Sequence, residues 1–348
     1  MLIPFLTIFF VSSALLSYEI LLMRLLAIIN WGHYAYMVVS ISMLGLGFSG
    51  VLLVFGSEFF KRYRNFLILT GCFLFSVSVP VCFYLSSNLP LNYLYLIWDI
   101  RQFLYIMGQF FLYSIPFLIA STILALFFTC FGDRTGKIYA FNLAGSGAGV
   151  VTALVIMYLV PPERYLSFPS IFGLIAGGLW SVYILTRKWW KVISICLVLL
   201  LIPSSILFSP DTLLPYMCQY KGLPGLLRLP DTRITHTYYS PLGIIHTCQG
   251  KHIRITAGLS LNFTGKVPGG QALTVDGGAP MPIYNIIDPE DMEFLDWTIF
   301  SSAYHLSKDP STLIIGVGGG RDILLAMYHK SRAVRVLEID PEIVQASA

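Results

Sequence analysis

Two features of the sequence carry residue types that can bind a nucleoside. The first is the glycine-rich run Gly316–Asp322, and the second is Glu338, about twenty residues after the run. Glycines let a ligand approach the backbone more closely than any Cβ would allow. An acidic side chain that closes the following strand can accept hydrogen bonds from the two ribose hydroxyls. Together these residues predict a nucleoside-binding turn.

The spacing of the glycines distinguishes between ligand classes. The motif G-x-G-x-x-G is typical of a dinucleotide site, and its third glycine lets the helix pack closely on the strand. Arg321 stands where that third glycine would be. The pattern therefore favours an adenosyl ligand without a pyrophosphate. A dinucleotide-dependent membrane oxidoreductase and a glycine-rich turn in some other α/β protein are the alternatives.

The same stretch resembles the first two cofactor motifs of the class I S-adenosylmethionine-dependent transferases, and most closely those of the spermidine synthase branch. A multi-pass membrane subgroup of that branch has G-x-GGGRD followed by V-E-x-x-P, which Gly316–Asp322 and Leu337–Pro341 resemble. The resemblance implies that Asp322 faces the amino acid or aminopropyl end of the ligand and that Glu338 holds the ribose. It implies that four glycines line the ligand: Gly316, Gly318, Gly319 and Gly320.

Three elements must position these residues. Thr312–Ile315 is a short apolar run of strand type, Ile323–Met327 continues with helix formers, and Ala333–Leu337 is a second apolar run. This order predicts a β-α-β unit with parallel strands. We expect residues 288–348 to be the first part of a Rossmann-like domain. A complete sheet of the family would need about seven strands, so we expect a truncated chain whose continuation supplies roughly 150 or more residues.

Composition indicates that most of the chain lies in a membrane. The 348 residues are 56% hydrophobic and 11% charged, and the mean hydropathy is +0.74. Soluble proteins carry about 25% charged residues, so an ordinary soluble protein is excluded. The net charge of +4 is scattered, and we expect no nucleic-acid partner. The six cysteines stand singly, without the spacing of a metal site or a disulfide framework.

Apolar stretches long enough to cross a bilayer fill residues 1–208. We expect about seven spans: Leu2–Ile29, Tyr34–Gly56, Phe66–Ser86, Phe103–Phe131, Ile138–Val160, Phe168–Thr186 and Val192–Phe208. The first contains Glu19 and Arg24, which we expect to meet partners on other helices because ionisable side chains are costly in lipid. Gly145 and Gly149, at four-residue spacing in the fifth span, predict close helix packing.

Loop charges predict the orientation of these spans. Basic residues on one side outnumber Arg101 and Arg164 on the other, which makes the N-terminus cytoplasmic. The more basic side holds Lys61, Arg62, Arg64, Arg134, Lys137, Arg187, Lys188 and Lys191. Seven crossings would then place the C-terminal part outside, away from a cofactor made from ATP. We therefore expect that part in the cytosol, so either Val192–Phe208 does not cross or Leu89–Trp98 contributes a further crossing.

Residues 209–287 predict a small antiparallel β domain. Apolar and polar residues alternate in stretches that are separated by turn residues: Ile234–Ser240, Gly243–Gln249, Lys251–Ala257 and Leu259–Thr264. In the spermidine synthase family a β-hairpin domain precedes the nucleotide fold and covers the substrate. The histidines of these strands do not have zinc-site spacing, so we expect no metal there: His236, His246 and His252.

The segment before the glycine-rich run is acidic and leads into an expected helix, Thr298–Leu306. Spermidine synthases bind the polyamine cation here with carboxylates and a Tyr-His-Glu sequence. Glu293 and Asp296 are the nearest counterparts, whereas Tyr304-His305 lacks the following acid. The alternative is an acidic helix start that is stabilised by the helix dipole. A small-molecule amine acceptor is therefore implied, without a polyamine specificity or an assigned catalytic base.

The sequence as a whole predicts a multi-pass α-helical membrane domain, a small β domain and the start of an α/β Rossmann-like fold. The implied function is transfer of an aminopropyl or methyl group from an adenosyl sulfonium donor. That donor is S-adenosylmethionine or its decarboxylated form, and the lipid bilayer is the expected partner. The alternative is a membrane transporter or sensor whose C-terminal part binds an adenosyl ligand without catalysis.

Overall fold

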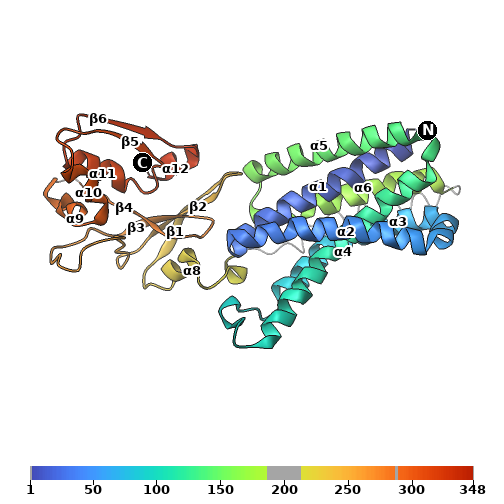
Figure 1. Cartoon of the computed structure of the whole chain (residues 1–348), viewed down its shortest axis with the longest axis horizontal. Coiled ribbons are helices and arrows are strands. Elements are labelled where there is room, and N and C mark those ends of the chain that lie inside the picture. The colour runs from blue at the N-terminus through green and yellow to red at the C-terminus, as the bar shows by residue number, and fades with distance from the viewer. Residues whose placement is uncertain (1, 186–212, 287–288, 348) are drawn as a thin grey trace. The chain divides into compact units, whose positions relative to one another are not determined.

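The computed structural model describes residues 2–185, 213–286 and 289–347, and the chain divides into two compact units (Figure 1). Unit 1 comprises Met1–Tyr216 and unit 2 comprises Met217–Ala348. Unit 1 consists of long helices, whereas unit 2 contains two small sheets and short helices. The expected boundary at residue 208 lies outside the described residues, and a further division at residue 288 stays a prediction.

Among the described residues, six helices of unit 1 are long and apolar enough to cross a membrane. They are α1 (Ile3–Ile29), α2 (Ala35–Phe55), α3 (Ser57–Ser87), α4 (Ile100–Cys130), α5 (Thr135–Leu159) and α6 (Ser167–Ile184). The first six apolar stretches of the sequence therefore do form helices of spanning length. The seventh expected span, Val192–Phe208, lies outside the described residues.

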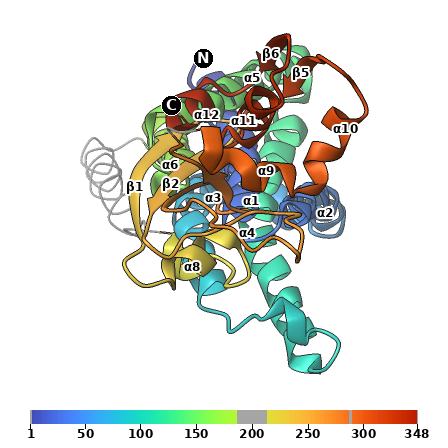
Figure 2. The ribbon, with the colours of Figure 1, turned by 90° about the vertical axis from the view of Figure 1, so that its left-hand side faces the viewer.

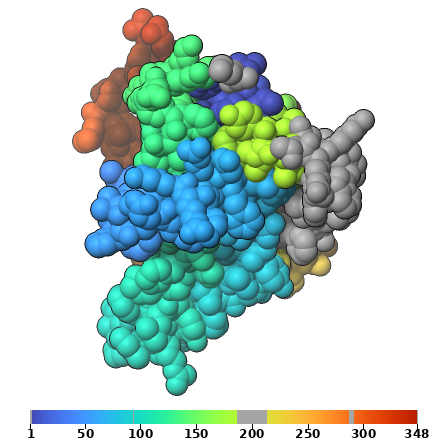
Figure 3. All heavy atoms as spheres, turned by 90° about the vertical axis from the view of Figure 1, so that its right-hand side faces the viewer, coloured from blue at the N-terminus to red at the C-terminus, as the bar shows by residue number. Residues whose placement is uncertain are grey.

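Helix α1 packs against α2, α4, α5 and α6. In the space-filling view of Figure 3 its dark blue atoms show only in a small area beside α5 and α6. Glu19 of α1 accepts a hydrogen bond from the Ser42 hydroxyl of α2 at 3.0 Å, so the expected partner on another helix is confirmed for Glu19. Burial on several sides makes α1 the helix that the others surround.

Small residues set the separation of α1 and α5. A Cβ at Gly145 would collide with the carbonyl oxygen of Phe9, and one at Gly149 would lie 2.6 Å from the carbonyl oxygen of Ser13. The Ser13 hydroxyl donates to the Gly145 carbonyl at 2.7 Å. The close packing predicted from the four-residue spacing is confirmed, because the two backbones approach where no side chain intervenes.

The outward faces of unit 1 are apolar. Val54 and Phe55 at the end of α2 are 76% and 89% exposed, and Leu159 at the end of α5 is 75% exposed. Large apolar side chains that stay exposed over several helices mark an interaction surface, and lipid is the environment that suits them. Length, composition and surface of these helices thus agree on a membrane-type domain.

The larger sheet of unit 2 is antiparallel, in the order β1-β2-β3-β4. Its strands are β1 (Arg233–Tyr239), β2 (Ile244–Gln249), β3 (Gln271–Val275) and β4 (Met281–Ile283). Figure 2 shows β1 and β2 side by side, in agreement with the pairing of Tyr239 with Ile244 across the turn. The first two predicted strands are confirmed.

The other two predicted strands, Lys251–Ala257 and Leu259–Thr264, are wrong. Residues 251–257 form a loop in which Ile253 is buried, and the Ile253 carbonyl accepts from the N–H of Gly270. The third strand of the sheet is β3, and its sequence does not alternate between apolar and polar residues. Ala272, Leu273 and Thr274 are all buried, so both faces of the strand are covered.

The smaller sheet is a parallel pair. It consists of β5 (Ser311–Ile315) and β6 (Ala333–Leu337), joined through α11 (Arg321–Tyr328) and followed by α12 (Pro341–Ser347). The predicted β-α-β unit is therefore confirmed for its two strands and their parallel direction. Among the described residues this sheet has two strands, so the wider Rossmann-like fold stays a prediction.

The helix expected over Thr298–Leu306 is wrong as one element. A 3-10 turn, Ile299–Ser301, precedes α10 (Ser302–His305). The hydroxyl of Thr298 donates to the Leu295 carbonyl at 2.7 Å, and that of Ser301 donates to the Asp296 carbonyl at 2.7 Å. Such local side-chain bonds compete with a regular helix and explain the interruption.

We predict that Gly149→Leu lowers the thermal stability of unit 1. The new side chain meets the α1 backbone at Ser13, and overpacking of this kind costs about 1–3 kcal/mol. Gly147→Leu is the matched control, because a Cβ there meets nothing within 4 Å. Circular dichroism melts of detergent-solubilised protein measure both. Equal melting temperatures for the two variants would contradict the packing.

We predict that unit 2 loses stability as pH falls from about 6.5 to about 4. Burial lowers the pKa of His246 in β2 from 6.5 to about 4, and the charge of Asp276 opposes this only in part. The unfolded chain binds a proton in that window that the folded chain does not, so stability is complete above pH 6.5 and declines below it. The decline is at most on the order of 3 kcal/mol.

Hydrogen exchange of peptides covering β2, corrected for intrinsic rates, measures this decline. His246→Gln should remove the pH dependence, whereas His252→Gln changes an exposed histidine and should leave it intact. An unchanged pH dependence in His246→Gln would show that another group controls the transition.

Candidate functional site

The glycine-rich turn leaves the carboxyl end of β5 and begins α11. The N–H of Gly316 donates to the Leu337 carbonyl at 2.8 Å, which extends the β5–β6 pairing by one residue. Gly316, Gly318 and Gly320 have φ values of +86°, +51° and +84°, which side chains rarely adopt. Gly320 is the residue that caps the N-terminus of α11. The turn therefore requires glycine at three of its positions for backbone reasons.

Glu338 follows β6 directly and binds the glycine turn. Its Oε2 accepts from the N–H of Val317 at 2.7 Å, and its Oε1 accepts from Ile339 at 2.8 Å and Asp340 at 3.1 Å. A carboxylate has about four acceptor sites, of which three are used here. The predicted acid thus lies beside the turn, with capacity for about one further hydrogen bond to a ligand.

The environment keeps Glu338 ionised. Burial raises the pKa of Glu338, but hydrogen bonds from the backbone N–H groups of Asp340, Val317 and Ile339 outweigh it, and the pKa is lowered below its ordinary value of 4.5. Hydrogen bonds to the charged form stabilise that form. At neutral pH Glu338 therefore presents a charged hydrogen-bond acceptor beside the turn.

A cavity of about 390 Å³ lies over the turn. This volume is in the range of small-molecule sites, about 300–1,000 Å³. Its lining brings together most of the predicted site residues, together with three from elsewhere: Gly316, Val317, Gly318, Gly319, Arg321, Asp322, Glu338, Met281, Pro282 and Ile343. Of the predicted residues, Gly320 does not line the cavity and serves as the helix cap instead.

Gly319 has a structural reason to be glycine. A Cβ at Gly319 would collide with the carbonyl oxygen of Pro282 in β4. We expected a glycine here to let a ligand approach the backbone. At Gly319 it is instead the neighbouring strand β4 that approaches the backbone of the turn. The sequence-based prediction missed Met281 and Pro282 because it misplaced the strands of that sheet, and it missed Ile343 because the recognised motif ends at Pro341, before this residue.

Asp322 reaches the cavity next to a cation. The Nε of Arg321 donates to Asp322 Oδ1 at 2.8 Å, and the guanidinium carbon lies 3.6 Å from the centre of the Phe300 ring. Phe300 therefore holds Arg321 in place by a cation–π contact. The predicted Asp322 is present in the cavity as one half of an ion pair and is 43% exposed on its side chain.

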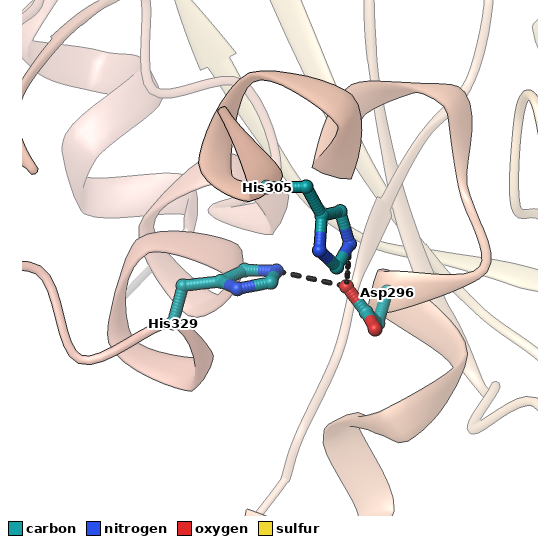
Figure 4. Close-up of side chains that lie close together, drawn as sticks. All are labelled: Asp296, His305 and His329. Carbon is teal, nitrogen blue, oxygen red and sulfur yellow. Dashed lines mark hydrogen bonds and ion pairs between the residues drawn. The ribbon is translucent and has the colours of Figure 1, made fainter. Parts of the chain in front are cut away.

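The acids expected on the acceptor side do not line the cavity. Glu293 is exposed, and Asp296 contacts two histidines instead (Figure 4). Asp296 Oδ1 lies 2.8 Å from His305 Nε2 and 2.9 Å from His329 Nε2. The polyamine-binding role implied for Glu293 and Asp296 therefore has no support in the geometry of the cavity.

A group of side chains that could hold a metal ion lies away from the strand histidines His236, His246 and His252. In the described part of the chain, one group of three side chains could jointly hold a metal ion: Asp296, His305 and His329. The strand histidine His246 is half-buried, and its buried Nδ1 has no hydrogen-bond partner among the described residues. Spacing along the chain does not reveal this group, because its members stand 9 and 24 residues apart, with none of the usual zinc spacings.

Comparisons with known proteins give no information on this site. No protein-family model matches the chain, and no curated protein or solved structure is significantly similar to it. The structure shows a cavity of small-molecule size at the carboxyl ends of two parallel strands, lined by residues of the glycine turn and by the ionised Glu338. Ligands of open α/β sheets bind at such strand ends.

Proposed function

We propose that unit 2 binds an adenosyl sulfonium compound in the cavity over the glycine turn, and that the protein is a membrane-anchored transferase similar to the spermidine synthases. The observation that carries the proposal is the pairing of Glu338 with Val317. It brings an ionised carboxylate to the turn that a ribose would cross. A Rossmann-like domain is the fold we propose for this part of the chain.

The cavity supports a donor with a nucleoside and a charged tail. The free acceptor site of Glu338 suits one ribose hydroxyl, and Gly316, where a Cβ would meet nothing within 4 Å, leaves room for the ligand beside the backbone. At the other end, Arg321 and Asp322 offer both charges to the amino acid part of S-adenosylmethionine, and Asp322 offers a carboxylate to the amine of its decarboxylated form.

Transfer from a sulfonium donor makes modest demands on the protein. The acceptor's nucleophilic atom attacks the carbon next to the sulfonium, that carbon–sulfur bond breaks, and the neutral thioether leaves with the bonding pair. The protein must align the two reactants and accept a proton if the nucleophile is an amine. We assign no base, because Glu293 and Asp296 lie outside the cavity lining.

We further propose that unit 2 is cytosolic, on the side where S-adenosylmethionine is made. Six crossings by the described helices return the chain at Leu185 to the side on which it starts. The basic residues Lys61, Arg134 and Lys137 lie at helix ends that share this side. The excess of positive charge supports a cytosolic N-terminus.

Glu338→Ala should weaken binding of S-adenosylmethionine or its decarboxylated form by roughly 10- to 150-fold, the value of a charged hydrogen bond of about 1.5–3 kcal/mol. Calorimetric titration of purified full-length protein measures this, with NAD as the competing ligand class. Glu293→Ala is the matched control, because it removes an exposed glutamate of unit 2 that does not line the cavity.

Hydrogen exchange of β5 and β6 in Glu338→Ala separates lost recognition from a lost fold. Tight binding of NAD without binding of either sulfonium compound would contradict the proposal. Binding without any transfer to amine acceptors would favour the sensor or transporter with an adenosyl-binding domain.

Fusions of a reporter that is active only in the cytosol should show activity after Arg134 and after Ala348, but none after Leu91. On this proposal the first two positions lie on the basic side of the membrane, and Leu91, which follows α3, lies on the other side. A fusion after Ala348 that behaves like the one after Leu91 would place unit 2 outside and remove its cofactor supply.

A further inference from the structure

Three polar side chains converge at the end of α11 that lies away from the glycine turn (Figure 4). Asp296 ends α9 (Glu293–Asp296), His305 ends α10, and His329 caps the C-terminus of α11. Their ligand atoms lie within 4.8 Å of one another. His329 follows Asp322 by about two helical turns, or roughly 10 Å along the axis. The group is therefore distinct from the cavity at the turn.

The two imidazoles compete for one oxygen. His305 Nε2 forms a hydrogen bond with Asp296 Oδ1 at 2.8 Å. His329 Nε2 lies 2.9 Å from the same oxygen, yet it is buried and makes no properly directed hydrogen bond within the described chain. Its ring nitrogen is close to the carboxylate but not aimed at it. A buried nitrogen of this kind calls for another partner.

We propose that Asp296, His305 and His329 bind a divalent first-row transition-metal ion. Two imidazole nitrogens and one carboxylate oxygen are ligands that Zn²⁺ and its neighbours accept. An ion between the three would take the lone pair of His329 Nε2 and replace the crowded contact at Asp296. This proposal does not rest on the adenosyl site.

The distances fit such an ion after a small adjustment. Tetrahedral ligands with bonds of about 2.0–2.1 Å stand roughly 3.3 Å apart, whereas the two nitrogen–oxygen distances are 2.8 and 2.9 Å. The ligand atoms must separate by about half an ångström. His305 can supply this movement, because its side chain is 57% exposed.

Neighbouring side chains fix the other two ligands, His329 and Asp296. The ring of Tyr304 stacks on that of His329 with centroids 4.9 Å apart and planes 10° apart, which fixes the imidazole. The Ser301 hydroxyl donates to the Asp296 carbonyl and fixes the chain at that residue. His329 lies at the C-terminal end of α11, where the helix dipole favours a cation.

The ion would link three helices and leave one position for water. Helices α9 and α10 have four residues each, too short to be stable alone, and both lie in the segment that leads into β5. Three protein ligands leave a fourth tetrahedral position, on the side of the exposed His305. We therefore assign the metal a positioning role for this segment, with a coordination site that solvent can reach.

Titration of the full-length protein with Zn²⁺ tests the proposal. The protein is purified without a histidine tag and stripped with a chelator, and calorimetry then gives stoichiometry and affinity. We expect one Zn²⁺ per chain and a higher melting temperature with metal. Co²⁺ substitution reports geometry, because four-coordinate Co²⁺ absorbs visible light much more strongly than six-coordinate Co²⁺.

Variants assign the ligands. His329→Ala and Asp296→Asn should each weaken Zn²⁺ binding by at least about 100-fold, because loss of a direct ligand exceeds the 10- to 100-fold effect of outer partners. His305→Ala changes an exposed side chain and preserves the fold even if the other two do not. His252→Ala is the matched control, an exposed histidine of the same unit that should bind Zn²⁺ as the wild type does.

Two results would overturn the proposal. One is the absence of stoichiometric Zn²⁺ or Co²⁺ binding by the wild type, which would make the group a hydrogen-bonded cluster alone. The other is equal Zn²⁺ affinity in the wild type and in folded His305→Ala. Neither result bears on adenosyl binding, so the two proposals fail independently.

Discussion

The carboxylate of Glu338 holds the glycine turn against the end of β6. Strand β6 is exposed along its whole length, and Ile315 and Leu337 at the paired strand ends are 81% and 59% exposed, so burial contributes little to joining β5 and β6. A two-stranded sheet of this kind is marginal by itself. Glu338 compensates by accepting three backbone hydrogen bonds, one of them from Val317 in the glycine turn. The interaction that orders the turn also supplies the anionic wall of the cavity.

The helices of unit 1 are held together differently, because small residues let their backbones come close. Gly145 and Gly149 of α5 meet the backbone of α1, and a Cβ at Gly45 of α2 would lie 3.0 Å from the backbone carbonyl carbon of Phe117 in α4. In lipid there is little hydrophobic drive between helices, so close packing and serine hydrogen bonds carry their association. The membrane-type unit and the sheet unit are thus stabilised by different physics within one chain.

Sequence reasoning succeeded where a pattern reflects local physics. The apolar spans, the parallel pair around the glycine turn and the place of Glu338 all follow from hydropathy, turn chemistry and strand order. It failed at β3, which is buried on both faces, and at Thr298–Leu306, where hydroxyl groups interrupt the helix. The contact of Gly319 with Pro282 and the convergence of His305 and His329 on Asp296 arise from tertiary packing, which spacing along the chain does not encode.

We propose that an adenosyl sulfonium compound occupies the cavity beside Glu338. Protein labelled with ¹⁵N-glycine reports on it directly, because Gly316, Gly318 and Gly319 line the cavity while Gly145 and Gly149 lie in the helical unit. Addition of S-adenosylmethionine or its decarboxylated form should shift the amide resonances of the first three and leave the last two unchanged. Unchanged resonances of Gly316, Gly318 and Gly319 at saturating concentrations of both compounds would contradict binding in this cavity.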